Sequence, residues 1–264
     1  GRALPAFRMF ADQVPMNAPA VVCNGAALYD FQAETYLETM ELPEAVRVQG
    51  QAVLDRFPAA AVEAYHLDNV IHAVRPNALT RQHQHVTHAG VETADSLLEV
   101  PMPLVKIMFE DDHEHLTALR DYVLQQAWSE NYEIFFSDRT LLEVTRKGAS
   151  KGAMVARLAQ RLGISPAHIY CAGDENNDLS MLTMAAEGFA PANCVETVRN
   201  CGATIVADCA HDTLAEIIAI LDKRYCAAGG GTLAVPVCRN PQYRPPALSH
   251  GTRQEVFCRR GASI

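Results

Sequence analysis

The stretch Ile169-Tyr170-Cys171-Ala172-Gly173-Asp174-Glu175-Asn176-Asn177-Asp178 decides the fold of this chain. Its first four residues have the apolar pattern of a short buried strand, and a polar loop follows at once. Residues 179–186 then predict a helix. A buried strand that leads through a polar loop into a helix is typical of α/β folds, in which ligands bind beyond the carboxyl ends of the strands. The sequence therefore predicts a binding site at this loop.

The loop carries groups suited to a metal ion and a phosphate. Asp174 and Asp178 lie four positions apart and offer the hard carboxylate oxygens that Mg²⁺ prefers. Asn177 offers an amide that can bind a phosphate oxygen without adding charge. Asp and Asn are also common helix N-caps, so the same residues fit a loop that only caps the next helix. Spacing alone leaves both interpretations open.

Lys151 stands at the start of a second predicted helix, over residues 151–162, which Gly163 ends as a C-cap. A lysine at a helix N-terminus is electrostatically misplaced, because the helix dipole there favours anions. Its ammonium and the neighbouring backbone N–H groups could instead hold one anion together. The alternative is an ordinary solvated surface lysine.

The pattern of the chain changes outward from this region. After residue 145, strands alternate with helices, as in a parallel doubly wound sheet. The predicted strands there are 169–172, 188–190 and 203–207, and the further predicted helices are 195–200 and 212–224. Residues 34–145 predict an antiparallel sheet with helices on one face. Its predicted strands are 36–42, 62–67, 70–74, 104–109, 133–136 and 141–145, and its predicted helices are 43–57 and 113–128.

The first residues predict a helix over 4–13 and a pair of strands over 20–23 and 26–29. The dipeptide Asn24-Gly25 joins these two strands and is typical of a hairpin turn.

The separate signals combine into one pattern: Lys151-Gly152 … Gly163-Ile164 … Gly173-Asp174-x-x-Asn177-Asp178-x-x-Met181-Leu182. It continues through Pro191-Ala192-Asn193 and Ala203-Thr204-Ile205-Val206-Ala207, and it includes Gly1-Arg2 and Asn24-Gly25-Ala26. Together these motifs cover roughly residues 1–225. The pattern closely resembles the haloacid dehalogenase superfamily, and within it the Cof-type phosphatases.

The resemblance implies an α/β fold: a Rossmann-like parallel-sheet core with an inserted α+β cap. On this basis we expect core parts at 1–33 and 146–225, the cap at 34–145 and a disordered or extraneous tail at 226–264. The implied function is that of a Mg²⁺-dependent phosphatase, a phosphoric monoester hydrolase of small phosphorylated metabolites. Because a cap blocks bulky substrates, sugar phosphates are favoured over phosphoproteins.

The same resemblance implies a role for each candidate residue. Lys151, Asp174 and Asp178 are the expected catalytic residues: Lys151 holds the phosphoryl group, Asp174 binds Mg²⁺, and Asp178 supports the metal. The expected metal site is thus formed by Asp174 and Asp178. Asn177, Asn24 and Gly25 are the expected substrate-binding residues. The physical logic is neutralisation of a transferring phosphoryl group by the metal and the lysine.

One motif of that family is missing from the sequence. The family's nucleophile is the first Asp of an Asp-x-Asp-Gly-Thr motif, whose second Asp is the general acid/base, and no such motif occurs here. We expect the missing segment to precede Gly1, and the core to lack its central strand. Without a carboxylate nucleophile the aspartyl-phosphate route is closed. The alternative function is therefore a non-catalytic remnant, or a module that binds phosphate and metal.

The composition and net charge of the chain limit the classes of partner that we expect it to bind. The chain has 31 acidic residues against 22 Lys and Arg, and this net charge of −9 disfavours a nucleic-acid partner. No apolar run reaches the roughly 20 residues of a membrane span. No signal peptide is visible, and the eight cysteines form no C-x-x-C pair, so we expect reduced thiols in the cytoplasm. Residues 226–264 hold five Arg and one Glu, which leaves a partner-binding arm as the alternative to a tail.

Three weaker clusters have structural explanations. His83, His85 and His88 lie close together, but no second ligand group has the spacing of a zinc site, so we expect solvated histidines. Glu110-Asp111-Asp112 precedes a predicted helix and is expected to stabilise its start. Trp128 and the pair Phe135-Phe136 are expected in the core of the cap.

Overall fold

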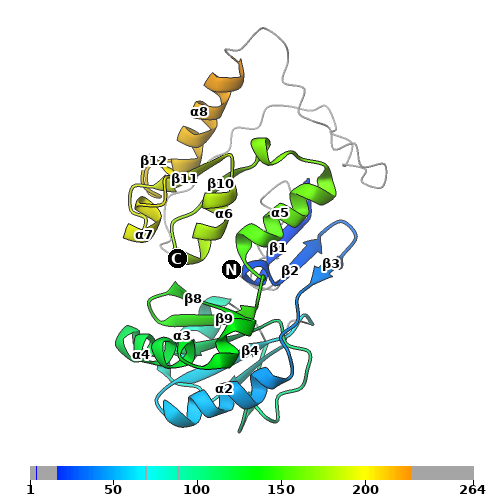
Figure 1. Cartoon of the computed structure of the whole chain (residues 1–264), viewed down its shortest axis with the longest axis vertical. Coiled ribbons are helices and arrows are strands. Elements are labelled where there is room, and N and C mark those ends of the chain that lie inside the picture. The colour runs from blue at the N-terminus through cyan, green and yellow to red at the C-terminus, as the bar shows by residue number, and fades with distance from the viewer. Residues whose placement is uncertain (1–3, 5–16, 69, 88–89, 227–264) are drawn as a thin grey trace.

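The structure is a computed structural model that describes residues 4, 17–68, 70–87 and 90–226. Its elements form two layers, one above the other in Figure 1. The lower layer holds a six-stranded sheet, and the upper layer holds a three-stranded parallel sheet and its helices. This arrangement confirms the α/β fold. The helix predicted over 4–13 lies outside the described residues except for Leu4, as does the predicted tail except for Cys226.

The first sheet is a small antiparallel one that carries the predicted hairpin. Its strands are β1 (Ala20–Val22), β2 (Ala27–Asp30) and β3 (Thr35–Thr39), in the order β1-β2-β3. The 3-10 turn η1 (Cys23–Gly25) joins β1 to β2, which confirms the turn predicted at Asn24-Gly25. The strand expected within the cap at 36–42 pairs with β2 instead, so this part of the chain belongs to the hairpin sheet.

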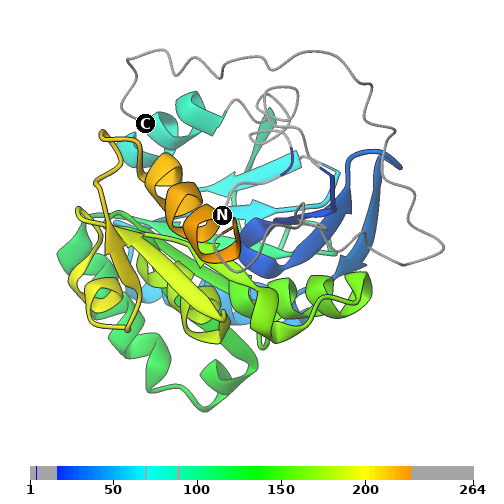
Figure 2. The same ribbon diagram turned by 90° about the horizontal axis from the view of Figure 1, so that it is seen from above.

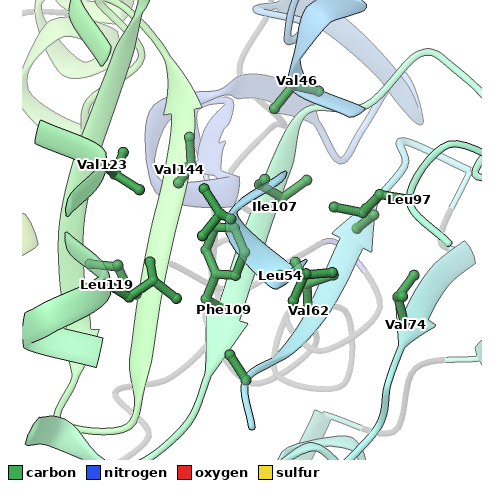
Figure 3. Packing of buried hydrophobic residues seen from close by; sticks show 14 of the residues in the cluster. Val46, Leu54, Val62, Val74, Leu97, Ile107, Phe109, Leu119, Val123 and Val144 are labelled. Atoms are coloured by element: carbon green, nitrogen blue, oxygen red, sulfur yellow. The ribbon is translucent and has the colours of Figure 1, made fainter. Parts of the chain in front are cut away.

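The large sheet has the strand order β6-β5-β4-β7-β9-β8. Its strands are β4 (Ala61–Tyr65), β5 (Val70–Val74), β6 (Gly90–Ala94), β7 (Lys106–Glu110), β8 (Tyr132–Asp138) and β9 (Leu141–Arg146). Helices α2 (Ala45–Arg56) and α4 (His113–Leu124) cover one face, and the 3-10 turn η2 (Ala127–Asn131) leads into β8. Figure 3 shows the apolar cluster between these helices and the sheet, with Phe109 and Ile107 of β7 at its centre.

Two expectations for this sheet are wrong. β5 and β6 are parallel, so the sheet is not wholly antiparallel. Parallel neighbours need a crossover connection, and helix α3 (Ala78–Thr87) provides it. Nor do all helices lie on one face. His83 of α3 contacts Glu63 of β4, whereas the strand neighbours of Glu63 point to the face that α2 and α4 cover.

The upper layer has the predicted alternation of strands and helices. The strands β10 (Tyr170–Ala172), β11 (Glu187–Pro191) and β12 (Thr204–Val206) are parallel neighbours, as predicted. Between and around them lie α5 (Lys151–Leu162), η3 (Pro166–His168), η4 (Asn176–Asp178), α6 (Leu179–Met184), α7 (Glu196–Arg199) and α8 (Thr213–Cys226). Helix α5 has the predicted bounds, and Gly163 ends it in the left-handed conformation at φ 69°.

The hairpin sheet and the parallel sheet are separate. Among the described residues, β1 pairs with β2 alone and β10 pairs with β11 alone, so each leaves one strand edge without a sheet partner. Figure 2 shows the blue hairpin sheet and the yellow β11 and β12 on opposite sides of the molecule. None of the described helices is long and apolar enough to cross a bilayer. Five described cysteines are free thiols: Cys23, Cys171, Cys194, Cys201 and Cys209.

Candidate phosphate- and metal-binding site

Asp178 contacts two of the other predicted site residues, Lys151 and Asp174. It is the last residue of η4, and its side chain is only 5% exposed. Its Oδ1 accepts a hydrogen bond from Nζ of Lys151 at 2.5 Å. Its Oδ2 accepts from the backbone N–H groups of Asp174 at 3.0 Å and Glu175 at 3.1 Å. The structure thus brings Lys151, Asp174 and Asp178 together, although these residues come from two separate segments of the chain.

The loop is folded tightly around the Asp178 carboxylate. A Cβ atom at Gly173 would lie 2.4 Å from Cβ of Asp178, so a side chain at this position would collide with the carboxyl group. Glu175 and Asp178 also form a capping box, in which each side chain accepts from the backbone N–H of the other. The capping interpretation therefore holds for Asp178, and the same carboxylate also binds Lys151.

The N-terminus of α5 presents Lys151 to this loop. Ser150 is the N-cap, and its side chain accepts from the backbone N–H of Ala153. The side chain of Lys151 is 19% exposed, so it is not the solvated surface lysine of the alternative interpretation. Gly152 lets α5 lie directly against α6, because a Cβ there would be 2.1 Å from the carbonyl oxygen of Ser180. Its N–H donates to Oγ of Ser180 at 3.0 Å.

The Asn24-Gly25 turn packs against the same helix end. Gly25 has φ +99°, and a Cβ atom there would lie 2.1 Å from the carbonyl oxygen of Ser150. This position therefore requires glycine for two reasons, its backbone conformation and its close approach to α5. Asn24 is buried, and its Oδ1 accepts a hydrogen bond from Nδ2 of Asn177 at 3.1 Å. The three predicted substrate-binding residues thus lie together beside Lys151 and Asp178.

Two charged residues of the large sheet complete this network, and sequence reasoning missed both. Nδ2 of Asn24 donates to Oε2 of Glu143 on β9 at 2.7 Å. The same oxygen accepts from Nζ of Lys106 on β7 at 3.0 Å, and both charged side chains are only 4% exposed. In the sequence each of them lies among apolar residues of a predicted strand, where a charged residue indicates a solvated face. Asn24 therefore links the large sheet to the η4 loop, which we define as residues 173–178.

The oxygen atoms at the loop fit a hard divalent cation. Asp174 is exposed, and Asp178 and Asn177 lie next to it. Oδ1 of Asn177 is buried and accepts no hydrogen bond from the described residues. A buried acceptor without a partner is costly, and a cation or a water bound to a cation would satisfy it. Carboxylate and amide oxygens are the ligands that Mg²⁺ takes, so these residues suit that ion.

The electrostatics of the loop favour a cation as well. Burial raises the pKa of Glu175, and the negative charges of Asp174, Asp138 and Asp178 raise it further. A positive ion among these carboxylates would relieve their repulsion. Cys23 adjoins the site, but burial raises the pKa of its thiol to about 11, so it remains protonated and is a poor nucleophile at neutral pH.

Some weaker expectations need correction. His83 is not solvated: its side chain is 20% exposed, and its Nδ1 lies 2.9 Å from Oε2 of Glu63. Glu110 does not stabilise the following helix, because it lies inside β7 with a fully buried side chain. Asp112 does have the expected role, since its side chain accepts from the backbone N–H of His115 at the start of α4. Trp128 and Phe136 pack against the apolar cluster of the large sheet, as expected.

Comparison with known proteins gives one family match. The family model described as haloacid dehalogenase-like hydrolase matches residues 1–218. Pyridoxal phosphate phosphatase YbhA of Escherichia coli strain K12 is 24% identical over 226 residues, which cover 83% of this chain and 82% of that protein. HMP-PP phosphatase of the same strain is 38% identical over 101 residues, but these cover only 37% of either chain.

Solved structures share the fold. A haloacid dehalogenase-like hydrolase from Bacteroides thetaiotaomicron matches with a TM-score of 0.70 at 20% identity, over 83% of this chain and 84% of that one. The HAD subclass IIB sugar phosphatase BT4131 matches with a TM-score of 0.71 at 18% identity, over 83% of this chain and 81% of that one. These likenesses support the two-layer architecture with its separate large sheet.

Proposed function

Because this chain belongs to the haloacid dehalogenase-like hydrolase family, we propose that its site is that of a Mg²⁺-dependent phosphatase of small phosphorylated metabolites. The observation that carries the proposal is the position of Asp178, which binds Lys151 with one oxygen and the backbone of Asp174 and Glu175 with the other. This arrangement places three kinds of group within one small region. They are the ammonium group of Lys151, the exposed carboxylate of Asp174 and the amide side chains of Asn24 and Asn177.

Each residue of this region has a separate role in binding a phosphate ester. Asp174 is exposed and holds the metal, together with oxygens of its neighbours in the loop. Asp178 has Lys151 on one oxygen and two N–H groups on the other, so it orients the loop and the lysine. Lys151 binds the phosphoryl group with its ammonium. Bound Mg²⁺ supplies further positive charge that stabilises the charge of a transferring phosphoryl group.

Small substrates follow from the position of the large sheet. Strand β8 lies against η4, and Asn24 connects Glu143 of β9 to Asn177. The large sheet therefore lies next to the site, which favours a small substrate over a macromolecule. Relatives are named for pyridoxal phosphate, HMP-PP and sugar substrates, all small phosphorylated compounds. We propose the same substrate class here, with sugar phosphates as the first compounds to test.

A second candidate function rests on a sequence observation. No Asp-x-Asp-Gly-Thr motif occurs within the 264 residues, and the hydrolysis route of the family needs a carboxylate nucleophile. Lys151 and Asp174 can bind a phosphoryl group, but neither attacks it in that route. Residues 1–264 by themselves would then form a module that binds metal and phosphate without turnover.

Phosphate release from p-nitrophenyl phosphate and sugar phosphates, with Mg²⁺ or with EDTA, separates these functions. For the 264 residues alone we expect negligible turnover. The coding DNA upstream of Gly1 is then read, and any in-frame Asp-x-Asp segment is added to the protein. A Mg²⁺-dependent rate of order 1–10³ s⁻¹ in the extended protein, lost in Asp174→Ala, supports the phosphatase.

Other outcomes also distinguish the phosphatase from the binding module. A stop codon upstream, or an extended protein that binds phosphate without turnover, supports the module and contradicts the phosphatase. A rate in the enzymatic range from residues 1–264 alone, lost in Asp174→Ala, contradicts the expected dependence on an added nucleophile.

A further inference from the structure

A second group of titratable residues lies in the large sheet, away from η4. It consists of Glu63 on β4, His83 on α3 and Glu110 on β7, and we call it the cap triad. Each residue offers one ligand atom, and the three atoms lie within 4.8 Å of one another. Three separate elements thus bring one imidazole nitrogen and two carboxylate oxygens to a single point. The proposed phosphatase function makes no use of them.

The distances between the ligand atoms of the cap triad are similar to those between two ligands of one metal ion. Nδ1 of His83 lies 2.9 Å from Oε2 of Glu63 and 3.4 Å from Oε1 of Glu110. Two ligands of a tetrahedral zinc ion, each about 2.1 Å from it, lie about 3.4 Å apart. Small adjustments of side chains would therefore give all three atoms suitable positions around one ion.

Glu110 has only the ion-pair contact with His83 in this arrangement. Its side chain is fully buried, and neither of its carboxylate oxygens accepts a hydrogen bond of standard geometry from the described residues, although the Thr80 side chain is close enough to lower the pKa of Glu110. A buried carboxylate without hydrogen bonds is expensive, and such groups in proteins are paired or bind metal ions. One of its oxygens is directed at His83, toward the centre of the cap triad.

Glu63 is held in place by other residues, as metal ligands are in known sites. The hydroxyl of Tyr65 donates to Oε2 of Glu63 at 2.6 Å. The amide of Gln84 donates to Oε1 of the same carboxylate at 3.1 Å. These bonds hold the carboxylate in one orientation, with Oε2 toward Tyr65 and Oε1 toward Gln84.

The excess of buried negative charge on this face also favours a cation at the cap triad. Glu63, Glu110 and Glu143 are three buried carboxylates on the same face of the sheet. Lys106, the buried lysine of that face, forms its ion pair with Glu143. The register places Met108 between Glu63 and Glu143, which stand two strands apart, at about 10 Å. A divalent ion at the cap triad would neutralise the two carboxylates that Lys106 does not.

We propose that the cap triad of Glu63, His83 and Glu110 binds one Zn²⁺-class divalent ion, separate from the metal of the η4 loop. The ligand chemistry distinguishes the two sites. Imidazole and carboxylate together suit zinc, whereas the all-oxygen loop suits Mg²⁺. The ion would tie α3 to β4 and β7 and so stabilise the large sheet. The proposal does not depend on the proposed phosphatase function.

Zinc binding to the full chain tests the proposal. The protein is stripped with EDTA, transferred to chelator-free buffer with excess Mg²⁺, and titrated with Zn²⁺ by calorimetry. We expect one tight Zn²⁺ per chain and a higher melting temperature. His83→Gln and Glu110→Gln should each weaken binding by roughly tenfold or more. Unchanged affinity in both variants, or no tight Zn²⁺ in the wild-type protein, would overturn the site.

Matched controls come from two other groups of the chain. Asp111, Asp112 and His115 form a similar but more exposed cluster, so His115→Gln should leave the affinity unchanged. Asp174→Asn alters the η4 loop and should also leave it unchanged. Loss of zinc in either control would assign the ion elsewhere and contradict the proposal.

Cobalt provides a measurement that needs no variant. Co²⁺ bound to the wild-type cap triad should give visible bands of a four- or five-coordinate nitrogen and oxygen site. An intense thiolate charge-transfer band would assign the ion to cysteines and overturn the proposal. This readout keeps its meaning if the His83 and Glu110 variants fail to fold.

Discussion

At the scale of single residues, Asp178 serves both the fold and the site. One carboxylate satisfies two backbone N–H groups of the loop and also holds the ammonium of Lys151. Its bonds within the loop are local, so they could be anticipated from Asp and Asn as capping residues. The bond to Lys151 joins positions 27 residues apart, and it was not predicted: the family resemblance placed both residues in one site but gave them separate roles.

Gly25 offers a sharp test of how closely the Asn24 turn approaches α5. Gly25→Ala should destabilise the protein by more than about 1–3 kcal/mol, because backbone strain at φ +99° adds to a 2.1 Å collision with Ser150. Gly163→Ala is the matched control: its φ is +69°, and nothing lies within 4 Å of the added Cβ. It should cost only about 1–2 kcal/mol. Urea unfolding of both variants measures the difference, and equal costs would contradict the close approach.

Glu110 should make stability depend on pH. Burial, and then the charge of Glu63, raises the pKa of Glu110 to about 7 from its usual 4.5. Between these values the folded state binds the proton more tightly than the unfolded state, so this group's stabilisation is lost as pH rises toward 7. Glu110→Gln should remove this component. Urea unfolding in EDTA from pH 5 to 8 checks it, and a difference between wild type and variant that stays constant with pH would contradict the raised pKa.

At the scale of elements, local signals gave the best predictions. Helix α5 has its predicted bounds because Ser150 caps one end and Gly163 ends the other. The crossover α3 and strand β6 were missed, since residues 78–94 are mostly polar and hold few apolar residues. Glu63, Lys106 and Glu143 were missed, and Glu110 was wrongly assigned to a helix start, because a charged residue in or beside a predicted strand does not show whether its face is solvated or covered by another layer.

The strands of the two layers should differ in their protection from hydrogen exchange. All five residues of β7 are buried, and β7 has neighbours on both sides. β10 has only partly buried or exposed residues and pairs, among the described residues, with β11 alone. Native-state exchange should therefore be slow at Lys106–Glu110 and fast at Tyr170–Ala172. Equal protection of the two strands would show that the core is closed by contacts that this account lacks.

At the scale of the whole molecule, the two layers meet at a polar network and at an apolar cluster that joins β1 and β2 to β4, β5 and β7. Asn24 accepts from Asn177 and donates to Glu143, so it connects the η4 loop to the large sheet. The sequence indicated two kinds of layer from strand–helix alternation on one side and clustered strands on the other. It could not indicate their contact, because that contact depends on side chains more than a hundred residues apart. The boundaries 34 and 145 stay a prediction, although β3 pairs with the hairpin sheet.

Binding of inorganic phosphate to the 264-residue chain, measured by calorimetry with and without Mg²⁺, tests the central claim most directly. The account predicts binding that requires Mg²⁺ and is lost in Lys151→Met and Asp174→Asn. Lys147→Met is the matched control, because Lys147 lies near Lys151 in the chain but is 61% exposed and pairs with Glu133. Phosphate binding that is independent of Mg²⁺, or that persists in both site variants, would contradict the assignment of Lys151 and Asp174 to one phosphate- and metal-binding site.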